Sequence, residues 1–138
     1  MWPTTASWIV EGGIGNRVKK LIFLDPESEW YLGLHASLSR ATDQSDLKSN
    51  IEWNVRRLID KGIDADSIRY FDGPILAMAI FEPESRNAWI RLEPWGPYME
   101  SKRAVIIVRR RKQRQAFNAL LESFNEMWER SRQVAERQ

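Results

Sequence analysis

The acidic residues Asp25, Glu27 and Glu29 offer the first candidate chemistry in this chain. They stand at alternate positions directly after the apolar run Leu21–Leu24, which predicts a β-strand. Paired carboxylates can hold a divalent metal ion or transfer protons, so a metal-dependent nuclease or phosphodiesterase is one hypothesis. Acidic residues also gather in the first turn of a helix, where they offset the positive end of the helix dipole. We favour this second interpretation and assign no metal ligand.

A second group combines aromatic residues with an arginine. Trp89, Trp95 and Tyr98 stand close to Arg91 in the sequence, and the last two belong to a proline-rich loop. Aromatic rings beside a guanidinium group can stack a sugar or a base. Aromatic packing within the loop is the alternative, and we leave both interpretations open.

A third group is basic. From Lys102 to Arg114 the chain has seven basic residues and no acidic one, and five of them form a dense run: Arg109, Arg110, Arg111, Lys112 and Arg114. Such a run can contact the phosphates of a nucleic acid. A solvated turn is the alternative, which we favour because the run is short and the net charge is only +2.

Two further features carry no chemistry that we assign. His35 is the single histidine, and without an identifiable partner it is expected to be a packing or surface residue. The glycines of residues 12–15 precede a strand and lack the third glycine of a dinucleotide fingerprint, so they predict a turn.

Composition excludes several classes of protein. The chain has 138 residues and no cysteine, which excludes a disulfide scaffold, a thiolate metal site and a cysteine nucleophile. One histidine excludes a multi-histidine zinc site. No apolar run reaches membrane-spanning length, and no secretory signal is visible. We therefore expect a cytoplasmic protein without a membrane partner.

Hydrophobic periodicity predicts the elements that position these groups. Strands are expected at residues 17–24, 68–71, 75–81, 87–92 and 104–108, and the apolar run Ile75–Phe81 fits a strand buried on both faces. A short helix is expected at Glu29–Leu38. The stripe from Leu47 to Ile59 predicts a second helix that Gly62 ends, and a third, long helix begins near Gln113.

These elements predict an α/β fold in one domain. We expect a single mixed β-sheet of about five strands with helices packed on it. The core should span about residues 17–130, with an N-terminal segment of uncertain role at residues 1–16 and a frayed, polar tail at residues 131–138.

Four segments together resemble one half of a phospholipase D-like domain: Leu21–Pro26, Ile51–Ile63, Ile68–Phe71 and Phe117–Trp128. The enzymes of that family carry a His-x-Lys-x4-Asp motif on a central strand. When the acid is aligned with Glu82, Ile75 and Ala77 occupy the histidine and lysine positions. The resemblance therefore implies a degenerate, non-catalytic member without a cofactor, and we assign no catalytic residue.

Similar domains serve as sensor modules joined to DNA-binding domains in transcription regulators, and single-half members commonly dimerise. The resemblance thus implies a homodimer, a possible DNA-binding partner domain, and a small polar or anionic ligand in the former active cleft. Its rim would use Asp25, Glu29, Arg69, Asp72, Arg91, Trp95 and Tyr98.

Three other functions remain open at this point. They are the metal-dependent nuclease or phosphodiesterase, a nucleic-acid-binding module that uses the run from Arg109 to Arg114, and a structural subunit whose tryptophans form a protein interface.

Overall fold

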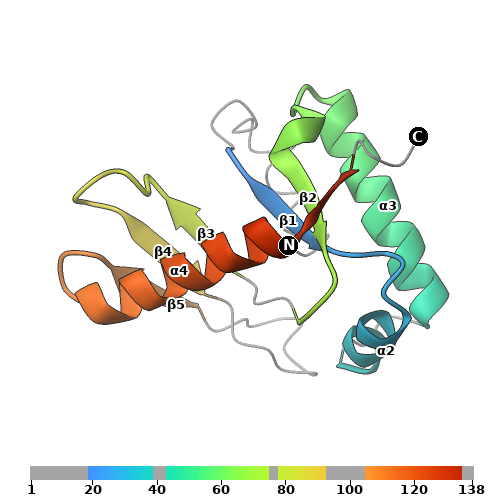
Figure 1. The fold of residues 1–138 in the computed structure, drawn as a ribbon, viewed down its shortest axis with the longest axis horizontal. Coiled ribbons are helices and arrows are strands. Elements are labelled where there is room, and N and C mark those ends of the chain that lie inside the picture. Colours follow the sequence, from blue (N-terminus) through green and yellow to red (C-terminus); the bar gives the residue numbers. More distant parts are fainter. Residues whose placement is uncertain (1–18, 39–42, 75–77, 93–104, 135–138) are drawn as a thin grey trace.

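The computed structural model describes residues 19–38, 43–74, 78–92 and 105–134 (Figure 1). These residues form an α/β fold. In chain order its elements are β1 (Leu21–Leu24), α2 (Glu29–Leu38), α3 (Gln44–Asp60), the 3-10 helix η2 (Ala65–Ser67), β2 (Ile68–Phe71), β3 (Met78–Phe81), β4 (Trp89–Leu92), β5 (Ile106–Arg109), α4 (Arg114–Arg130) and β6 (Arg132–Gln133).

The strands form two sheets of three, so the prediction of one five-stranded sheet was wrong. In the first sheet β1 pairs with β2 in parallel, and β6 pairs with the other edge of β2 in the antiparallel direction. In the second sheet β3, β4 and β5 form an antiparallel meander. Among the described strands, β3, β4 and β5 pair only with one another, and β6 occupies the edge of β2, so the two sheets are separate.

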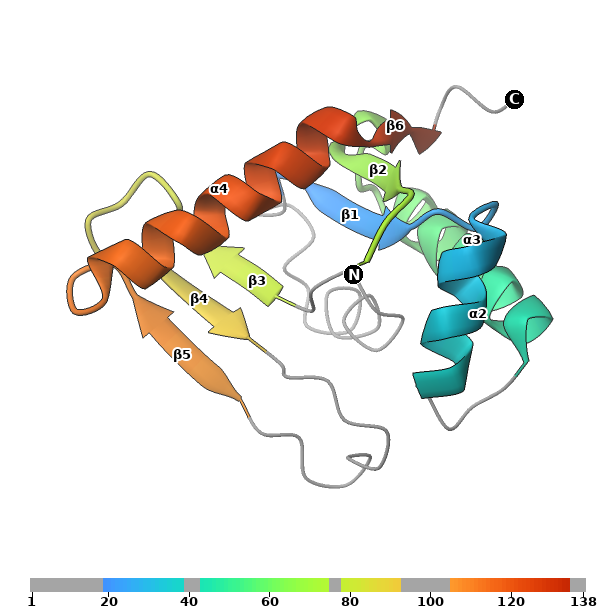
Figure 2. The ribbon, with the colours of Figure 1, turned by 60° about the horizontal axis from the view of Figure 1, so that its bottom comes forward.

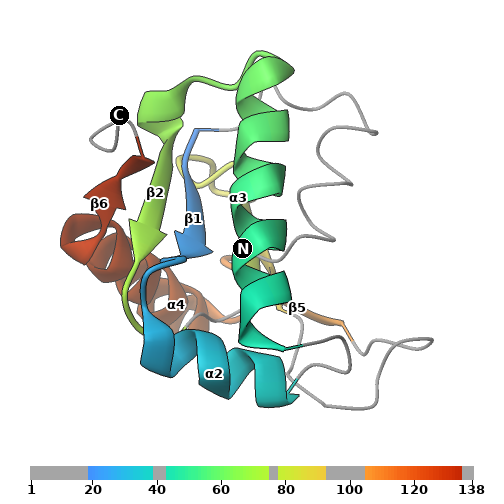
Figure 3. The same ribbon diagram turned by 90° about the vertical axis from the view of Figure 1, so that its right-hand side faces the viewer.

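Helices cover both faces of the first sheet. All four residues of β1 are buried, so this strand needs apolar neighbours on each side. Figure 3 shows α3 along one side of β1 and β2 and α4 on the other. Core residues Leu32, Ile51 and Leu58 come from α2 and α3, whereas Trp128 comes from the end of α4.

A second, smaller core lies between α4 and the second sheet. Its buried members are Ala88, Ile90, Val108 and Phe117. Figure 2 shows α4 running above the second sheet with its first turns and reaching the first sheet with its last. The predicted long amphipathic helix is therefore confirmed, and it is the element that joins the two sheets.

The predicted helix after residue 43 is also confirmed. It starts three residues earlier than its apolar stripe, because the carboxylate of Asp43 accepts a hydrogen bond from the backbone N–H of Asp46 and caps the helix. Gly62 follows its end with φ of 103°, a conformation that favours glycine, as the sequence predicts.

Two predictions about strands and ends were wrong. Of the strand expected at 75–81 the structure describes β3, and its residues are half-buried rather than buried on both faces, because α4 covers only one face of this sheet; residues 75–77 lie outside the described residues. The tail expected to fray from residue 131 instead contributes Arg132 and Gln133 to β6. No helix in the described part of the chain is long and apolar enough to cross a membrane.

Candidate functional site

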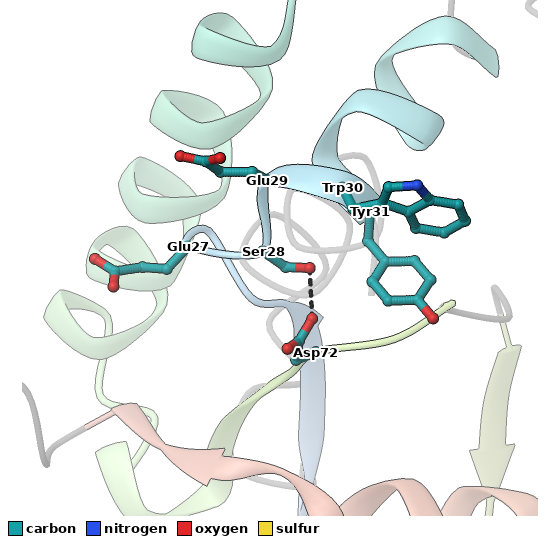
Figure 4. A pocket seen from close by; sticks show the side chains of 6 residues that line it. All are labelled: Glu27, Ser28, Glu29, Trp30, Tyr31 and Asp72. Atoms are coloured by element: carbon teal, nitrogen blue, oxygen red, sulfur yellow. Dashed lines mark hydrogen bonds between the residues drawn. The ribbon is translucent and has the colours of Figure 1, made fainter.

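A pocket of about 590 Å³ lies at the carboxyl ends of β1 and β2 (Figure 4). Because these strands are parallel, both chain segments leave the sheet at the same edge, which is where α/β sheets collect ligands. The lining residues are Glu27, Ser28, Glu29, Trp30, Tyr31 and Asp72. The polar stretch after the first strand therefore does line a pocket.

The segment after β1 is shaped by Asp25. Its backbone N–H donates to the carbonyl of Phe71 at 2.9 Å, which extends the pairing of the two strands. Its carboxylate accepts a hydrogen bond from the N–H of Glu27 at 2.9 Å, and its carbonyl accepts one from the N–H of Ser28 at 3.0 Å. This turn starts α2 at once and brings residues 27–31 to the sheet edge.

A side-chain hydrogen bond ties the two strand ends together beneath the pocket. The hydroxyl of Ser28 donates to the carboxylate of Asp72 at 2.5 Å, as Figure 4 shows. Gly73 follows, and a Cβ at this position would lie only 2.5 Å from the ring of Phe71. A side chain at this position would therefore require the ring of Phe71 to move.

The carboxylates of the pocket point in different directions. In Figure 4 the side chains of Glu27 and Glu29 point to one side, Trp30 and Tyr31 lie on the other, and Asp72 faces Ser28. Within the ranges that the structure describes, no group of three or more His, Cys, Asp or Glu residues could hold a metal ion. The structure thus does not assemble Asp25, Glu27 and Glu29 into a metal site.

Asp25 is instead held by an arginine 107 positions away in the sequence. The Nε and Nη2 atoms of Arg132 donate to the two carboxylate oxygens of Asp25, each at 2.7 Å. The Asp25 side chain is only 10 % exposed. These hydrogen bonds raise the pKa of the Arg132 guanidinium, so this side chain stays charged at any ordinary pH. Asp25 therefore fastens β6 to the end of β1.

The other predicted ligand residues separate into different places. Glu29 and Asp72 line the pocket. Arg69 donates from Nη1 to the carbonyl of Trp128 at 2.7 Å and lies 4.2 Å from the centre of its ring, so it holds α4 against β2. Arg91 belongs to β4 in the second sheet. Trp95 and Tyr98 lie outside the described residues.

Sequence reasoning missed the aromatic part of the pocket. Trp30 is 69 % exposed, and the ring of Tyr31 meets it edge to face with centroids 4.7 Å apart. Their position directly after Glu29 was a usable signal, because a tryptophan at the start of a helix at a sheet edge has little to pack against.

His35 is a packing residue, as expected. It is 3 % exposed within α2, and burial lowers its pKa to about 4. The imidazole is therefore neutral near pH 7.

The five residues of the basic run differ in their surroundings. Arg110 donates to the carbonyls of Pro83 and Ser85 and lies 4.5 Å from the ring centre of Phe117, so it joins the β3–β4 turn to α4. The others are exposed: Arg109, Arg111, Lys112 and Arg114. Only these four are placed to meet a partner.

Comparisons with protein-family models, with curated proteins and with solved structures find no match for this chain.

Proposed function

We propose that this chain is a non-catalytic binding domain that takes a small, positively charged polar molecule into the pocket at the ends of β1 and β2. The observation that carries the proposal is that the exposed Trp30 and three carboxylates, those of Glu27, Glu29 and Asp72, line one pocket, with Trp30 on one side of it and Glu27 and Glu29 on the other. An aromatic face and nearby carboxylates both attract an organic cation. The sequence led us to expect a small polar or anionic ligand; none of the described residues that line the pocket is basic, which disfavours an anion.

The size of the pocket supports a small molecule. The site is a shallow, open depression of about 590 Å³, so it would contact one side of a small ligand and leave the other side in solvent. The Ser28–Asp72 hydrogen bond holds the two sides of the site together before a ligand arrives. A preformed site loses less conformational entropy on binding, so even a few contacts can give measurable affinity.

The resemblance to phospholipase D-like sensor modules supplies the regulatory part of the proposal. In that role the domain would report its ligand to a DNA-binding partner domain, and it would act as a homodimer. The first half of the chain is compatible with such a module, since a parallel β1–β2 pair with helices between its strands carries the pocket at its carboxyl edge.

Isothermal titration calorimetry with tetramethylammonium chloride and with L-arginine methyl ester tests the proposal. We expect saturable binding of at least one cation in the millimolar range or below, and none of glucose 6-phosphate. Trp30→Ala should weaken binding by about 3- to 10-fold, in line with the loss of a cation–π contact. Glu29→Gln should also weaken binding, and the loss of affinity should be larger at low salt than at high salt, because salt screens the attraction between the carboxylate and the cation.

Trp53→Ala is the matched control, because Trp53 is also an exposed helical tryptophan, 57 % exposed on α3, and does not line the pocket. The proposal is wrong if neither cation binds, or if the two tryptophan variants lose affinity equally. Hydrolysis of bis(4-nitrophenyl) phosphate that needs Mg²⁺ or Mn²⁺ and is lost in the Glu27→Gln variant would instead establish the metal-dependent alternative.

A further inference from the structure

The second sheet has two chemically different faces. Ile80, Ile90 and Val108 are register partners across β3, β4 and β5, and they belong to the core that packs against α4. Neighbouring residues along a strand point to opposite faces. The adjacent row, formed by Phe81, Trp89 and Arg109, therefore points away from α4.

This outer row combines stacked aromatic rings with a cation. The rings of Phe81 and Trp89 are nearly parallel, with an interplanar angle of 12° and centroids 4.1 Å apart. Both side chains are half-buried, whereas Arg109 is exposed. Because β4 lies between β3 and β5, Phe81 and Arg109 are the register partners of Trp89 on its two sides. A planar group can stack there beside a guanidinium.

Positive charge surrounds this position. In the β3–β4 turn, and from the end of β5 to the start of α4, the exposed acids are Glu82 and Glu84, and the exposed basic residues are Arg86, Arg109, Arg111, Lys112 and Arg114. Helix α4 begins at the same end of the sheet and has no acidic residue in its first turn. Basic charge is therefore in clear excess beside the aromatic pair.

We propose that this outer face binds single-stranded nucleic acid, with a base stacked on Trp89 and phosphates held by Arg109 and its basic neighbours. Stacking on an aromatic ring together with salt-dependent phosphate contacts is how proteins bind single strands without reading their sequence. A duplex keeps its bases stacked on one another, so its bases cannot use Trp89. This surface lies on the second sheet and is separate from the pocket at the ends of β1 and β2.

The occupant follows from charge complementarity. Strand β5 is an edge of its sheet and exposes Val105, Ile106 and Ile107, which would also suit pairing with a second copy. A second copy would bring the same excess of basic charge to this surface, whereas a polyanion would neutralise it. Self-association through β5 would therefore contradict the proposal.

Fluorescence anisotropy with the full chain and 5′-labelled oligo(dT) and oligo(rU) of 15 nucleotides tests the proposal. Three to four phosphate contacts predict a loss of affinity of roughly 20- to 50-fold between 50 and 200 mM salt. We expect both single strands to bind and a DNA duplex of the same length to bind more weakly. A preference for one sugar would show whether the 2′-hydroxyl is contacted.

Arg109→Gln is the main variant, because this exposed side chain can change without loss of core packing. It should weaken binding of both single strands by about 3- to 10-fold and make the dependence on salt less steep. Trp89→Phe keeps an aromatic ring beside Phe81. It should reduce the quenching of the protein's own tryptophan fluorescence when an unlabelled oligonucleotide binds. Arg56→Gln, an exposed arginine on α3, is the matched control and should bind as the unchanged protein does.

Three results would overturn the proposal. They are no binding at 50 mM salt, an equal effect of Arg109→Gln and Arg56→Gln, or a duplex that binds as tightly as the single strands. Sedimentation that shows a dimer lost on Ile106→Lys, together with absent nucleic-acid binding, would assign the surface to a second copy.

Discussion

At the scale of single residues, charged side chains of the kind that could bind a ligand instead form contacts that stabilise the fold. Asp25 and Arg132 form a two-pronged ion pair, and Arg69 binds the last turn of α4 through the carbonyl and ring of Trp128. Each contact joins segments far apart in the sequence. The sequence singled out Asp25 and Arg69 as ligand residues, but it gave no sign of these structural contacts.

The Asp25–Arg132 pair predicts a stability effect. Asp25→Asn leaves the guanidinium of Arg132 without its carboxylate in a site that is only partly exposed, so the free energy of unfolding should fall by about 3 kcal/mol. Urea denaturation measures this change. Glu52→Gln, on the exposed face of α3, is the control and should alter stability by less than about 0.5 kcal/mol. Equal stability of the two variants would show that the pair contributes nothing.

His35 predicts how stability depends on pH. The unfolded chain takes up a proton near pH 6.5, whereas the buried imidazole stays neutral down to about pH 4. Unfolding therefore binds a proton between these values, and His35 alone should lower stability by up to roughly 3 kcal/mol as pH falls from 7 to 4.

Because His35 is the only histidine, its ring resonances give its pKa directly by NMR, and we expect a value near 4. Urea denaturation of His35→Phe should show a shallower loss of stability over the same pH range. A titration near pH 6.5 in the folded protein would contradict the prediction.

At the scale of elements, two glycines with opposite roles allow a matched test. Gly33 lies inside α2, and an added Cβ would meet only the Oε1 atom of Gln44 at an ordinary 3.5 Å. Gly62 ends α3 with φ of 103°, where any L side chain is strained although space is open. Gly33→Ala should therefore stabilise by about 0.5–1 kcal/mol, and Gly62→Ala should destabilise by about 1 kcal/mol.

Thermal denaturation of the two glycine variants measures the difference. The sign of the change in stability is the test, since both substitutions add one methyl group, one within α2 and the other after the end of α3. A stabilising Gly62→Ala would show that the left-handed conformation is not required at the end of α3.

At the scale of the whole molecule, α4 connects the two sheets. Phe117 near its start is fully buried against the second sheet, and Trp128 near its end is buried against the first. We therefore expect one cooperative unit in which a defect at one end of α4 reaches both sheets.

Phe117→Leu tests this coupling by amide hydrogen exchange. The smaller side chain should lower stability by about 1–2 kcal/mol and reduce the protection of amides in β1 and β2 as well as in β4 and β5. Asn118→Ala, an exposed neighbour on α4, should leave both sheets protected. Reduced protection confined to β4 and β5 would show that the sheets unfold independently.

The sequence alone determined much of the local structure. The periods of apolar residues located β1, β2, β4, the helix that begins at Gln44 and the long helix α4, because side-chain periodicity reflects the geometry of the element itself. It also placed polar residues after β1 and after β2, where Glu29 and Asp72 line a pocket.

Only the tertiary structure decided how these pieces pair. The sequence of a strand does not determine which strand it pairs with. The division into two sheets and the pairing of β6 with the edge of β2 could therefore not be predicted. For the same reason the partner of Asp25, 107 positions away, was out of reach. Apolar periodicity is a local property, whereas strand pairing and ion pairing depend on which distant segments the packed helices bring together.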